Sequence, residues 1–286
     1  MARIDAGRVP SWLLTMSGWL VGRGAEPATQ LLGYHAVGEG GSPLSLPTQR
    51  FRQQIEWLLS LGYRFETLSS WWCLASAGRQ APGPCAIVTF DDGYRSVLLH
   101  AAPVLASYGI RATLFAVTDY IGSVNGYDEV RAGISQQPLL TWEELRELTR
   151  RGWDVQSHGA RHLSLTTLPL AQLDHEVRES KARLEQRLGT QVKFFAYPYG
   201  LVNRRAAVAV ARAGYQGGVT CRSGVLSEGA GADPYRLPRI MCDQLPTFQD
   251  FTLRFSPGYQ RLLHLRTRMQ GRFALSVRPE PDRGWA

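Results

Sequence analysis

The segment Cys85-Ala86-Ile87-Val88-Thr89-Phe90-Asp91-Asp92-Gly93 runs from an apolar stretch into two adjacent carboxylates and a glycine. A short apolar run bounded by turn residues is typical of a buried strand, so the carboxylates fall where the strand meets its loop. Neighbouring carboxylates repel one another, and a chain that keeps such a pair usually offsets it with a cation or a shifted pKa. The alternative is a solvated turn, the commoner setting of an isolated Asp-Asp-Gly.

Two further strand-like segments end in residues suited to a site. Residues 153–157 lead into His158-Gly159-Ala160-Arg161-His162, where two histidines four apart can share one face of a turn. Residues 194–196 lead into Tyr197-Pro198-Tyr199-Gly200, and such strand ends carry chemistry in barrels and open α/β sheets. One aspartate with two imidazoles leaves coordination positions open, as expected of a catalytic Zn²⁺-like ion. The alternative is that the histidines are surface or helix-packing residues.

The rest of the chain alternates strand-like and helix-like patterns. The expected strands are residues 31–37, 85–90, 112–117, 153–157, 192–197 and 217–220. The expected helices are residues 51–61, 142–151, 170–188 and 204–213, with start and stop signals at Thr141, Gly152, Gly189 and Gly214. This alternation predicts an α/β fold on a parallel sheet, most economically a closed barrel with one core.

The motifs TFDDGY (89–94), SHGARH (157–162) and AYPYG (196–200), in this order, resemble those of the NodB-type polysaccharide deacetylases, carbohydrate esterase family four. The resemblance spans roughly residues 31–240. It implies a distorted (β/α) barrel with seven or eight strands, and removal of acetyl groups from N-acetylated or sometimes O-acetylated sugars. It also implies that Asp91 is the general base and that Asp92, His158 and His162 bind a divalent metal, Zn²⁺ first, with Co²⁺ or Ni²⁺ as alternatives.

The implied chemistry assigns each group a task. A metal would polarise the amide carbonyl and lower the pKa of its water towards roughly 7, and Asp91 would accept the proton. The backbone N–H of Tyr199 is the oxyanion donor that the resemblance implies. Tyr94 and Tyr199 are expected to contact the sugar because the motifs fix their positions, with ordinary packing as the alternative. The polar excursion at residues 118–128 should overhang this face and govern substrate choice.

Two positions depart from the family pattern. Many members carry a histidine in a Leu-x-His motif that protonates the leaving amine, but residues 236–243 contain no histidine. Instead, Tyr34-His35 resembles a signature of the branch that includes poly-β-1,6-N-acetylglucosamine deacetylases, so His35 is the predicted general acid. Its alternative is a histidine that satisfies a backbone group. Ala196 replaces the arginine that orients the base in much of the family, and Arg239 is predicted to reach that carboxylate instead.

Both ends of the chain differ from the middle. We expect an N-terminal extension at residues 1–30, a catalytic domain at 31–256 and a basic tail at 257–286. The apolar run at 9–21 is interrupted, lacks a convincing cleavage site and is too short to span a bilayer of about 30 Å. A cytoplasmic or peripheral membrane enzyme is favoured, with an uncleaved interfacial segment or a cryptic export signal as the alternatives.

Net charge points to the kind of partner. The formal charge is +8, and the tail is rich in arginine, which suits anionic membrane surfaces or acidic glycans. No nucleic-acid-binding motif accompanies the charge, so nucleic acid is not expected. A merely exposed tail is the alternative. The four cysteines show no metal-binding or redox spacing and are expected to be free thiols. The sequence leaves the oligomeric state open.

Two function classes follow. The first is a metal-dependent hydrolase that removes N-acetyl groups from a hexosamine-containing glycan, oligosaccharide or glycolipid of the envelope or an exopolysaccharide. O-deacetylation, or hydrolysis of a non-sugar amide, would use the same site. The second is a weak or inactive carbohydrate-binding relative that has lost the two missing family residues. The retention of Asp91, which metal binding does not require, favours the enzyme.

Overall fold

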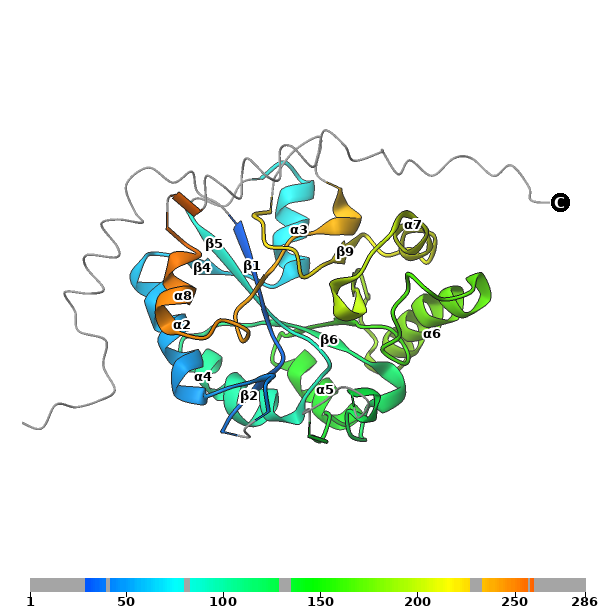
Figure 1. Ribbon diagram of the computed structural model, residues 1–286, viewed down its shortest axis with the longest axis horizontal. Helices are drawn as coiled ribbons and strands as arrows, with labels where there is room; N and C mark the ends of the chain where they lie inside the picture. Colours follow the sequence, from blue (N-terminus) through cyan, green and yellow to red (C-terminus); the bar gives the residue numbers. More distant parts are fainter. Residues whose placement is uncertain are drawn as a thin grey trace, which may run out of the picture.

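The computed structural model describes residues 29–39, 42–79, 83–128, 135–226, 233–256 and 258–259. The predictions for residues 1–28 and for the arginine-rich tail from 260 onwards lie outside the described residues. One parallel sheet forms the centre (Figure 1), and its strands are β1 (Thr29–Tyr34), β4 (Arg64–Phe65), β5 (Cys85–Phe90), β6 (Thr113–Ala116), β7 (Asp154–Ser157), β8 (Phe194–Ala196), β9 (Gly217–Val219) and β10 (Ile240–Met241). β2 (Ala36–Val37) and β3 (Ser45–Leu46) pair separately.

The sheet curls back towards its own first edge. Its order is β10-β1-β5-β6-β7-β8-β9, with every adjacent pair parallel. Leu237, just ahead of β10, pairs in parallel with Val219 of β9, while β10 itself pairs with β1. The strand β5 pairs at its start with β4 and at its end with β6, which distorts the curl. The predicted α/β fold with a distorted, curled parallel sheet is therefore confirmed, but the sheet is a half-barrel and not the closed barrel that the sequence pattern favoured.

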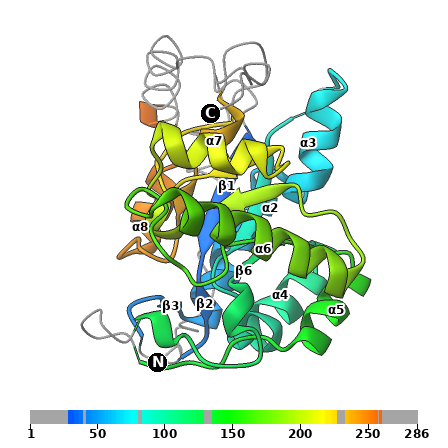
Figure 2. The same ribbon diagram turned by 90° about the vertical axis from the view of Figure 1, so that its right-hand side faces the viewer.

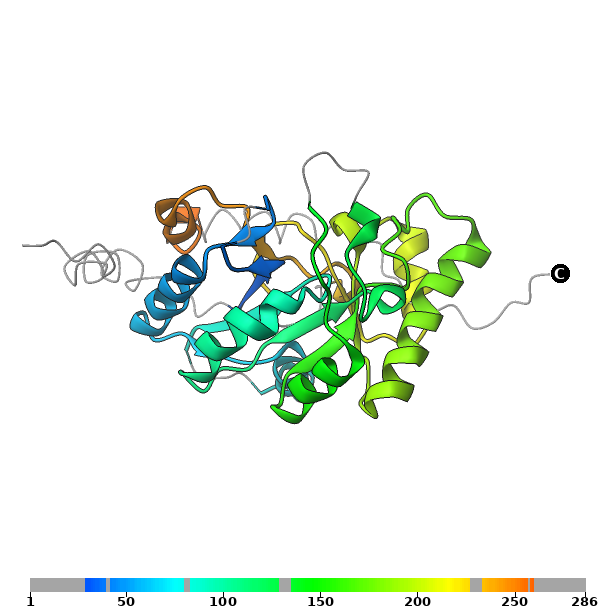
Figure 3. The ribbon, with the colours of Figure 1, turned by 90° about the horizontal axis from the view of Figure 1, so that it is seen from below.

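Helices surround this sheet (Figures 1 and 2). They are α2 (Thr48–Ser60), α3 (Leu68–Ser76), α4 (Ala102–Ala106), α5 (Trp142–Arg150), α6 (Leu170–Leu188), α7 (Arg204–Arg212) and α8 (Phe248–Leu253), with a π-helical turn at Val97–Ala101 before α4. α5 and α6 pack side by side (Figure 3, green and yellow-green). The start signal at Thr141 is a capping box with Glu144, and the stop signal at Gly189 has a φ of 68°. None of the described helices is long and apolar enough to cross a membrane.

Side-chain alternation separates the two faces of the sheet. In β5, Cys85 and Ile87 belong to the smaller buried cluster, whereas Ala86 and Val88 belong to the larger one. The smaller cluster combines residues of five strands with α3 and fills the barrel; its strand members are Leu31, Cys85, Ile87, Phe115, Phe194, Ala196 and Val219. The larger cluster packs the outer helices against the sheet. Burial on both faces explains why β1 and β5 are exposed at no more than 7% at any residue.

One end of the barrel is covered by α3, which the sequence patterns did not predict. Trp71 donates its ring N–H to Thr29, the first residue of β1, at 3.1 Å. The N–H of Leu68 donates to Thr113, the first residue of β6, at 2.9 Å. Ser69 donates to Asp154, the first residue of β7. These contacts block the amino ends of the strands, so chemistry is confined to the opposite, carboxyl end.

Candidate active site

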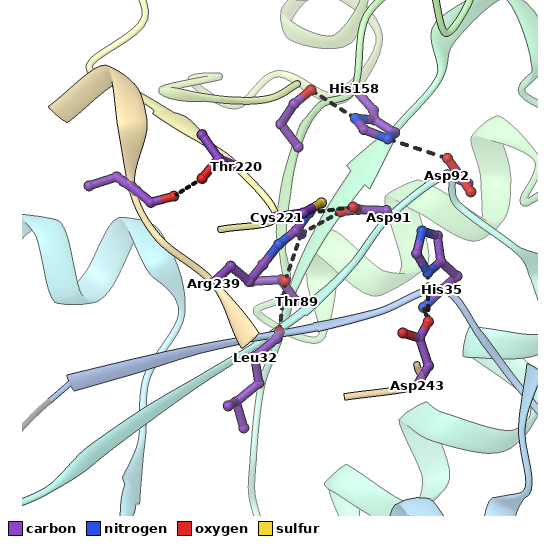
Figure 4. A network of polar contacts seen from close by, with 12 residues as sticks. Leu32, His35, Thr89, Asp91, Asp92, His158, Thr220, Cys221, Arg239 and Asp243 are labelled. Atoms are coloured by element: carbon purple, nitrogen blue, oxygen red, sulfur yellow. Dashed lines mark hydrogen bonds and ion pairs between the residues drawn. The ribbon is translucent and has the colours of Figure 1, made fainter. Parts of the chain in front are cut away.

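The alternation of inward-facing and outward-facing side chains along the strands brings the candidate residues together at the carboxyl end of the sheet. Thr89 and Asp91 continue the inward-facing series Cys85, Ile87, and His35 continues the series that Leu31 begins in β1. His158 follows β7, and Arg239 precedes β10. Figure 4 shows these side chains gathered at the carboxyl ends of the strands, although the sequence distance between His35 and Arg239 is 204 residues.

Asp92, His158 and His162 form a metal-site triad. One potential ligand atom from each residue lies within 4.8 Å of the others, and all three side chains are buried. The Oδ1 atom of Asp92 is 3.4 Å from Nε2 of His158 and 3.4 Å from Nε2 of His162. Among the described residues, this is the only such group of His, Cys, Asp and Glu side chains.

The donor atoms of this triad fit a divalent cation. Nδ1 of His158 lies 2.8 Å from the carbonyl oxygen of Ala196, so it carries the hydrogen and Nε2 directs a lone pair towards Asp92. Oδ1 of Asp92 is buried without a hydrogen-bond partner. A carboxylate oxygen and two imidazole nitrogens facing one another without a shared hydrogen bond are costly unless a cation joins them. The triad therefore suits a divalent metal, whose identity the donors alone do not fix.

Left-handed backbone marks the same place. Asp92, His162 and Tyr199 have φ angles of 68°, 60° and 62°, and they are the only residues other than glycine with positive φ in the described part of the chain. This conformation is unfavourable for residues with a Cβ and clusters at functional sites. Two of the three are metal-site residues, and the third places its ring edge-on to His162, with centroids 4.7 Å apart.

Asp91 is paired with Arg239 through two hydrogen bonds. The guanidinium Nη1 and Nη2 atoms donate to the two carboxylate oxygens at 2.7 and 2.6 Å. Nη1 also donates to the hydroxyl of Thr89 at 3.1 Å, and this hydroxyl donates to the carbonyl of Leu32 at 2.8 Å (Figure 4). Arg239 is fully buried, and it makes the contact with the Asp91 carboxylate that the sequence analysis predicted for it.

His35 is paired with Asp243, a residue that the sequence analysis did not single out. Nδ1 of His35 lies 2.6 Å from Oδ2 of Asp243, and the backbone N–H of His35 donates to the same oxygen at 2.9 Å. The Asp243 side chain is fully buried. A carboxylate placed just beyond a strand end was the available signal, but β10 is only two residues long and gave no recognisable strand pattern.

Comparison with known proteins identifies the family. The family profile described as polysaccharide deacetylase matches residues 78–218. YxkH of Bacillus subtilis, which carries the same family name, is 30% identical over 210 residues, covering 73% of this chain and 70% of that protein. The chain belongs to the polysaccharide deacetylase family. Another relative of this chain is the poly-β-1,6-N-acetyl-D-glucosamine N-deacetylase of Staphylococcus epidermidis, 30% identical over 207 residues and covering 69% of this chain and 68% of that one.

Solved structures share the fold of this chain. IcaB from Ammonifex degensii superposes with a TM-score of 0.68 at 24% identity, covering 82% of this chain and 97% of that chain. The Streptococcus pyogenes deacetylase PplD, solved in complex with acetate, gives a TM-score of 0.64 at 22% identity, covering 84% and 97%. At these identities the likeness concerns the arrangement of strands and helices.

In the metal-free protein, nearby charges shift the pKa values of Asp91 and His35 in opposite directions. Burial alone would raise the pKa of Asp91, but Arg239 and His158 outweigh it and hold the pKa below its usual value. Burial alone would lower the pKa of His35, but Asp243, together with Asp92 and Asp91, raises it to about 10. At neutral pH, Asp91 is therefore a carboxylate and His35 an imidazolium.

The pKa values of the three metal-site residues are also shifted from their ordinary values. Burial lowers the pKa of His162 to about 3, so its imidazole is neutral near pH 7 and able to bind a metal. For Asp92, the nearby histidines outweigh burial and keep the pKa below its usual value. For His158, Asp91 and Asp92 outweigh burial and raise the pKa. A cation that binds here therefore competes with a proton on His158.

The loop at residues 118–128 reaches the metal-site face. The Tyr127 ring packs on His162, with centroids 4.4 Å apart. The expected sugar contact at Tyr94 is wrong, because Tyr94 is fully buried. Its hydroxyl accepts a hydrogen bond from the side chain of Asn125 at 3.1 Å, so it supports the loop from below. The four cysteines are free thiols, as expected.

Proposed function

We propose that this deacetylase hydrolyses the N-acetyl groups of a hexosamine-containing glycan or glycolipid, with Asp91 as general base and His35 as general acid. The observation that carries the proposal is the pair of flanking ion pairs, Arg239 with Asp91 and Asp243 with His35. They place an ionised carboxylate and a protonated imidazole beside one metal-site triad. Titratable groups whose environments push their pKa values apart are the pattern of an acid and base working together.

Asp92, His158 and His162 are the residues that would hold the cation. When bound, a divalent metal, with Zn²⁺ as the first choice and Co²⁺ or Ni²⁺ as alternatives, would polarise the acetyl carbonyl and activate water for attack. The His₂Asp donor set supports this assignment, because three protein ligands would leave a bound ion room for water or substrate.

Asp91 accepts the proton as water adds to the acetyl carbon. Arg239 fixes the plane of this carboxylate by its two hydrogen bonds, so one oxygen lone pair keeps a constant direction. The oxyanion that forms needs a donor, and the backbone N–H of Tyr199, beside His162, is our candidate.

His35 donates a proton to the amine nitrogen as the carbon–nitrogen bond breaks. Asp243 fixes Nδ1 of His35, so Nε2 is the nitrogen from which the proton leaves. The products are acetate and a free amine. A leaving amine requires this proton more than a leaving alcohol does, so a histidine held in its charged form supports N-deacetylation over O-deacetylation.

The substrate class is inferred from relatives. The Staphylococcus epidermidis relative is named for poly-β-1,6-N-acetyl-D-glucosamine, which supports an N-acetylglucosamine polymer as the first substrate to test. An O-acetyl esterase is the second candidate. An inactive sugar-binding protein is disfavoured. Arg239 contacts Asp91 although position 196 is an alanine, and His35 offers an imidazole although segment 236–243 has no histidine, so neither missing family residue leaves its role unfilled.

The test is acetate release from N-acetylglucosamine oligomers by the Zn²⁺-loaded protein. Asp91→Asn should abolish release while retaining bound metal, because it removes the base and leaves the triad intact. Exposed Asp174→Asn on α6 provides a matched control and should match the parent. Absence of release from N-acetylated oligomers together with release from O-acetylated ones would replace the amidase by the esterase.

A further inference from the structure

Glu176 of α6 is a fully buried carboxylate. It belongs neither to the metal-site triad nor to the Asp91–Arg239 and His35–Asp243 pairs. It lies on the buried stripe of the helix, next to Val177 and one turn from Leu173 and Ser180. Burying a carboxylate is costly unless hydrogen bonds satisfy it. An apolar residue would be the usual choice at this position. The hydrogen bonds that Glu176 makes therefore indicate why the fold keeps a carboxylate there.

All of these contacts go to the segment that joins the two metal-site histidines. Oε2 of Glu176 accepts the backbone N–H of Ala160 at 3.0 Å and that of Arg161 at 2.9 Å. Oε1 accepts Nε of Arg161 at 2.6 Å. Ala160 and Arg161 immediately precede His162, so the hydrogen bonds of their amide groups fix the position of the His162 backbone.

Glycine is required where the segment approaches Glu176. Gly159 has a φ of 87°, and a Cβ there would lie only 3.2 Å from Oε2 of Glu176. A side chain would therefore both strain the backbone and push the carboxylate away from its two N–H donors. The close approach of Glu176 therefore explains why the SHGARH motif has a glycine directly after its first histidine.

A second contact from the same helix holds the start of the segment. The hydroxyl of Ser157 donates to the hydroxyl of Ser180 at 2.8 Å, and Ser180 in turn donates to the carbonyl of Glu176 at 2.7 Å. The N–H of Gly159 donates to Ser157 Oγ at 3.2 Å. One turn of α6 therefore holds the segment both before His158 and before His162.

We propose that Glu176 is a positioning residue that orders residues 159–161, so that both histidines face Asp92 before a cation binds. The inference rests on the proposed function only in that the triad binds a divalent cation. It explains how His162 keeps an unfavourable left-handed backbone, with a φ of 60°, in the metal-free protein. Residues that orient ligands without touching the metal typically contribute about 10–100-fold to metal affinity.

The first test is Zn²⁺ affinity, measured by competition with a chromophoric chelator. Glu176→Leu keeps the volume but removes both acceptors, and it should weaken binding by about 10–100-fold. Glu176→Gln can keep one oxygen on the two N–H groups and should recover most of the affinity. Glu179→Leu, at an exposed position of the same helix, is the matched control and should bind as the parent does. Parental affinity in a folded Glu176→Leu protein would overturn the proposal.

The second test uses the unaltered protein and is decisive even if Glu176→Leu does not fold. Hydrogen exchange of the Ala160 and Arg161 amides is measured with Zn²⁺ and with chelator. The proposal predicts protection in both states, since Glu176 rather than the metal holds these amides. Protection that appears only with Zn²⁺ would overturn it. If the parent binds no metal in the first test, the proposed function fails, while this exchange measurement still judges the role of Glu176.

Discussion

Arg239 donates a hydrogen bond to each carboxylate oxygen of Asp91, at 2.7 and 2.6 Å, from a position 148 residues later, directly before β10. Both side chains are buried, so the pair is shielded from solvent and salt. In the family pattern an arginine beside the third motif orients the base, and here Ala196 stands in its place. A guanidinium from elsewhere in the fold makes the contact, and its two-pronged geometry is what a single ammonium group could not reproduce.

Replacing Arg239 with lysine should lower kcat by about 100-fold with little loss of metal. Lysine keeps the charge but cannot hold both oxygens, so the Asp91 carboxylate is free to rotate. Steady-state acetate release gives kcat, and metal analysis of the purified protein gives the Zn²⁺ content. Thermal unfolding serves as the control, because a partly unpaired buried carboxylate also destabilises the fold. Loss of metal in parallel with activity would contradict the assignment.

Replacing Asp243 with asparagine should move the alkaline limb of the pH profile of kcat/KM to lower pH. Asp243 is the main group that raises the pKa of His35 to about 10, so without its charge His35 loses the acidic proton at lower pH. The profile is measured on N-acetylglucosamine oligomers between pH 6 and 10. An alkaline limb that stays where the parent has it would exclude His35 as the titrating acid.

The same pair should contribute to stability in a defined pH window. The folded pKa of His35 is raised above 6.5, so its contribution is full below pH 6.5 and is lost as pH rises towards 10. The stability difference between the metal-free parent and Asp243→Asn should therefore shrink as pH rises through that window. Urea unfolding at several pH values measures it, and a difference independent of pH would speak against the charged pair.

Replacing His35 with glutamine should harm amide hydrolysis far more than hydrolysis of an activated ester. A leaving amine needs the proton, and a positioned acid contributes about 10²- to 10⁴-fold. A nitrophenolate leaves without one, so 4-nitrophenyl acetate should report a change of only a few-fold. Both rates are measured on the same Zn²⁺-loaded preparation. Equal losses on the two substrates would assign His35 a structural or metal-site role.

Metal should stabilise the fold through the triad. A ligand at 100 times its Kd that binds only the folded state adds about 2.7 kcal/mol to the free energy of unfolding. Zn²⁺ should therefore raise the melting temperature of the parent, and chelator should reverse the rise. In Asp92→Asn the shift should disappear, since a neutral amide oxygen binds a divalent cation far more weakly than the Asp92 carboxylate that faces both histidines. A persisting shift would place the cation elsewhere.

Much of the fold could be predicted because its signals are local. The strand 85–90 was expected at its observed bounds, and the helix 170–188 likewise, since an apolar run and clear stop residues define them. By contrast, α3 was missed because its Trp71 and Leu68 bury themselves against the barrel end, which no helical pattern reveals on its own.

The site was less accessible to sequence reasoning than the fold. The motif residues Asp91, Asp92 and His158 follow strands with strong patterns, so their common location could be expected. Asp243 could not, because its importance depends on a three-dimensional contact with His35, 208 residues away. Tyr94 failed in the opposite way: its motif position gave its place in the chain but not the direction of its side chain, which points into the core. The catalytic roles themselves stay predictions until they are measured.

The short segment from Leu237 to Asp243 links β9 with β1 and also supplies the partners of Asp91 and His35, the two groups proposed to transfer protons. All three metal-site residues, by contrast, lie at or before position 162. The cation site and the partners of Asp91 and His35 are therefore supplied by separate stretches of the chain. Substitutions at Arg239 or Asp243 are therefore expected to spare the metal-site triad while impairing proton transfer, so metal content alone is a poor index of active enzyme.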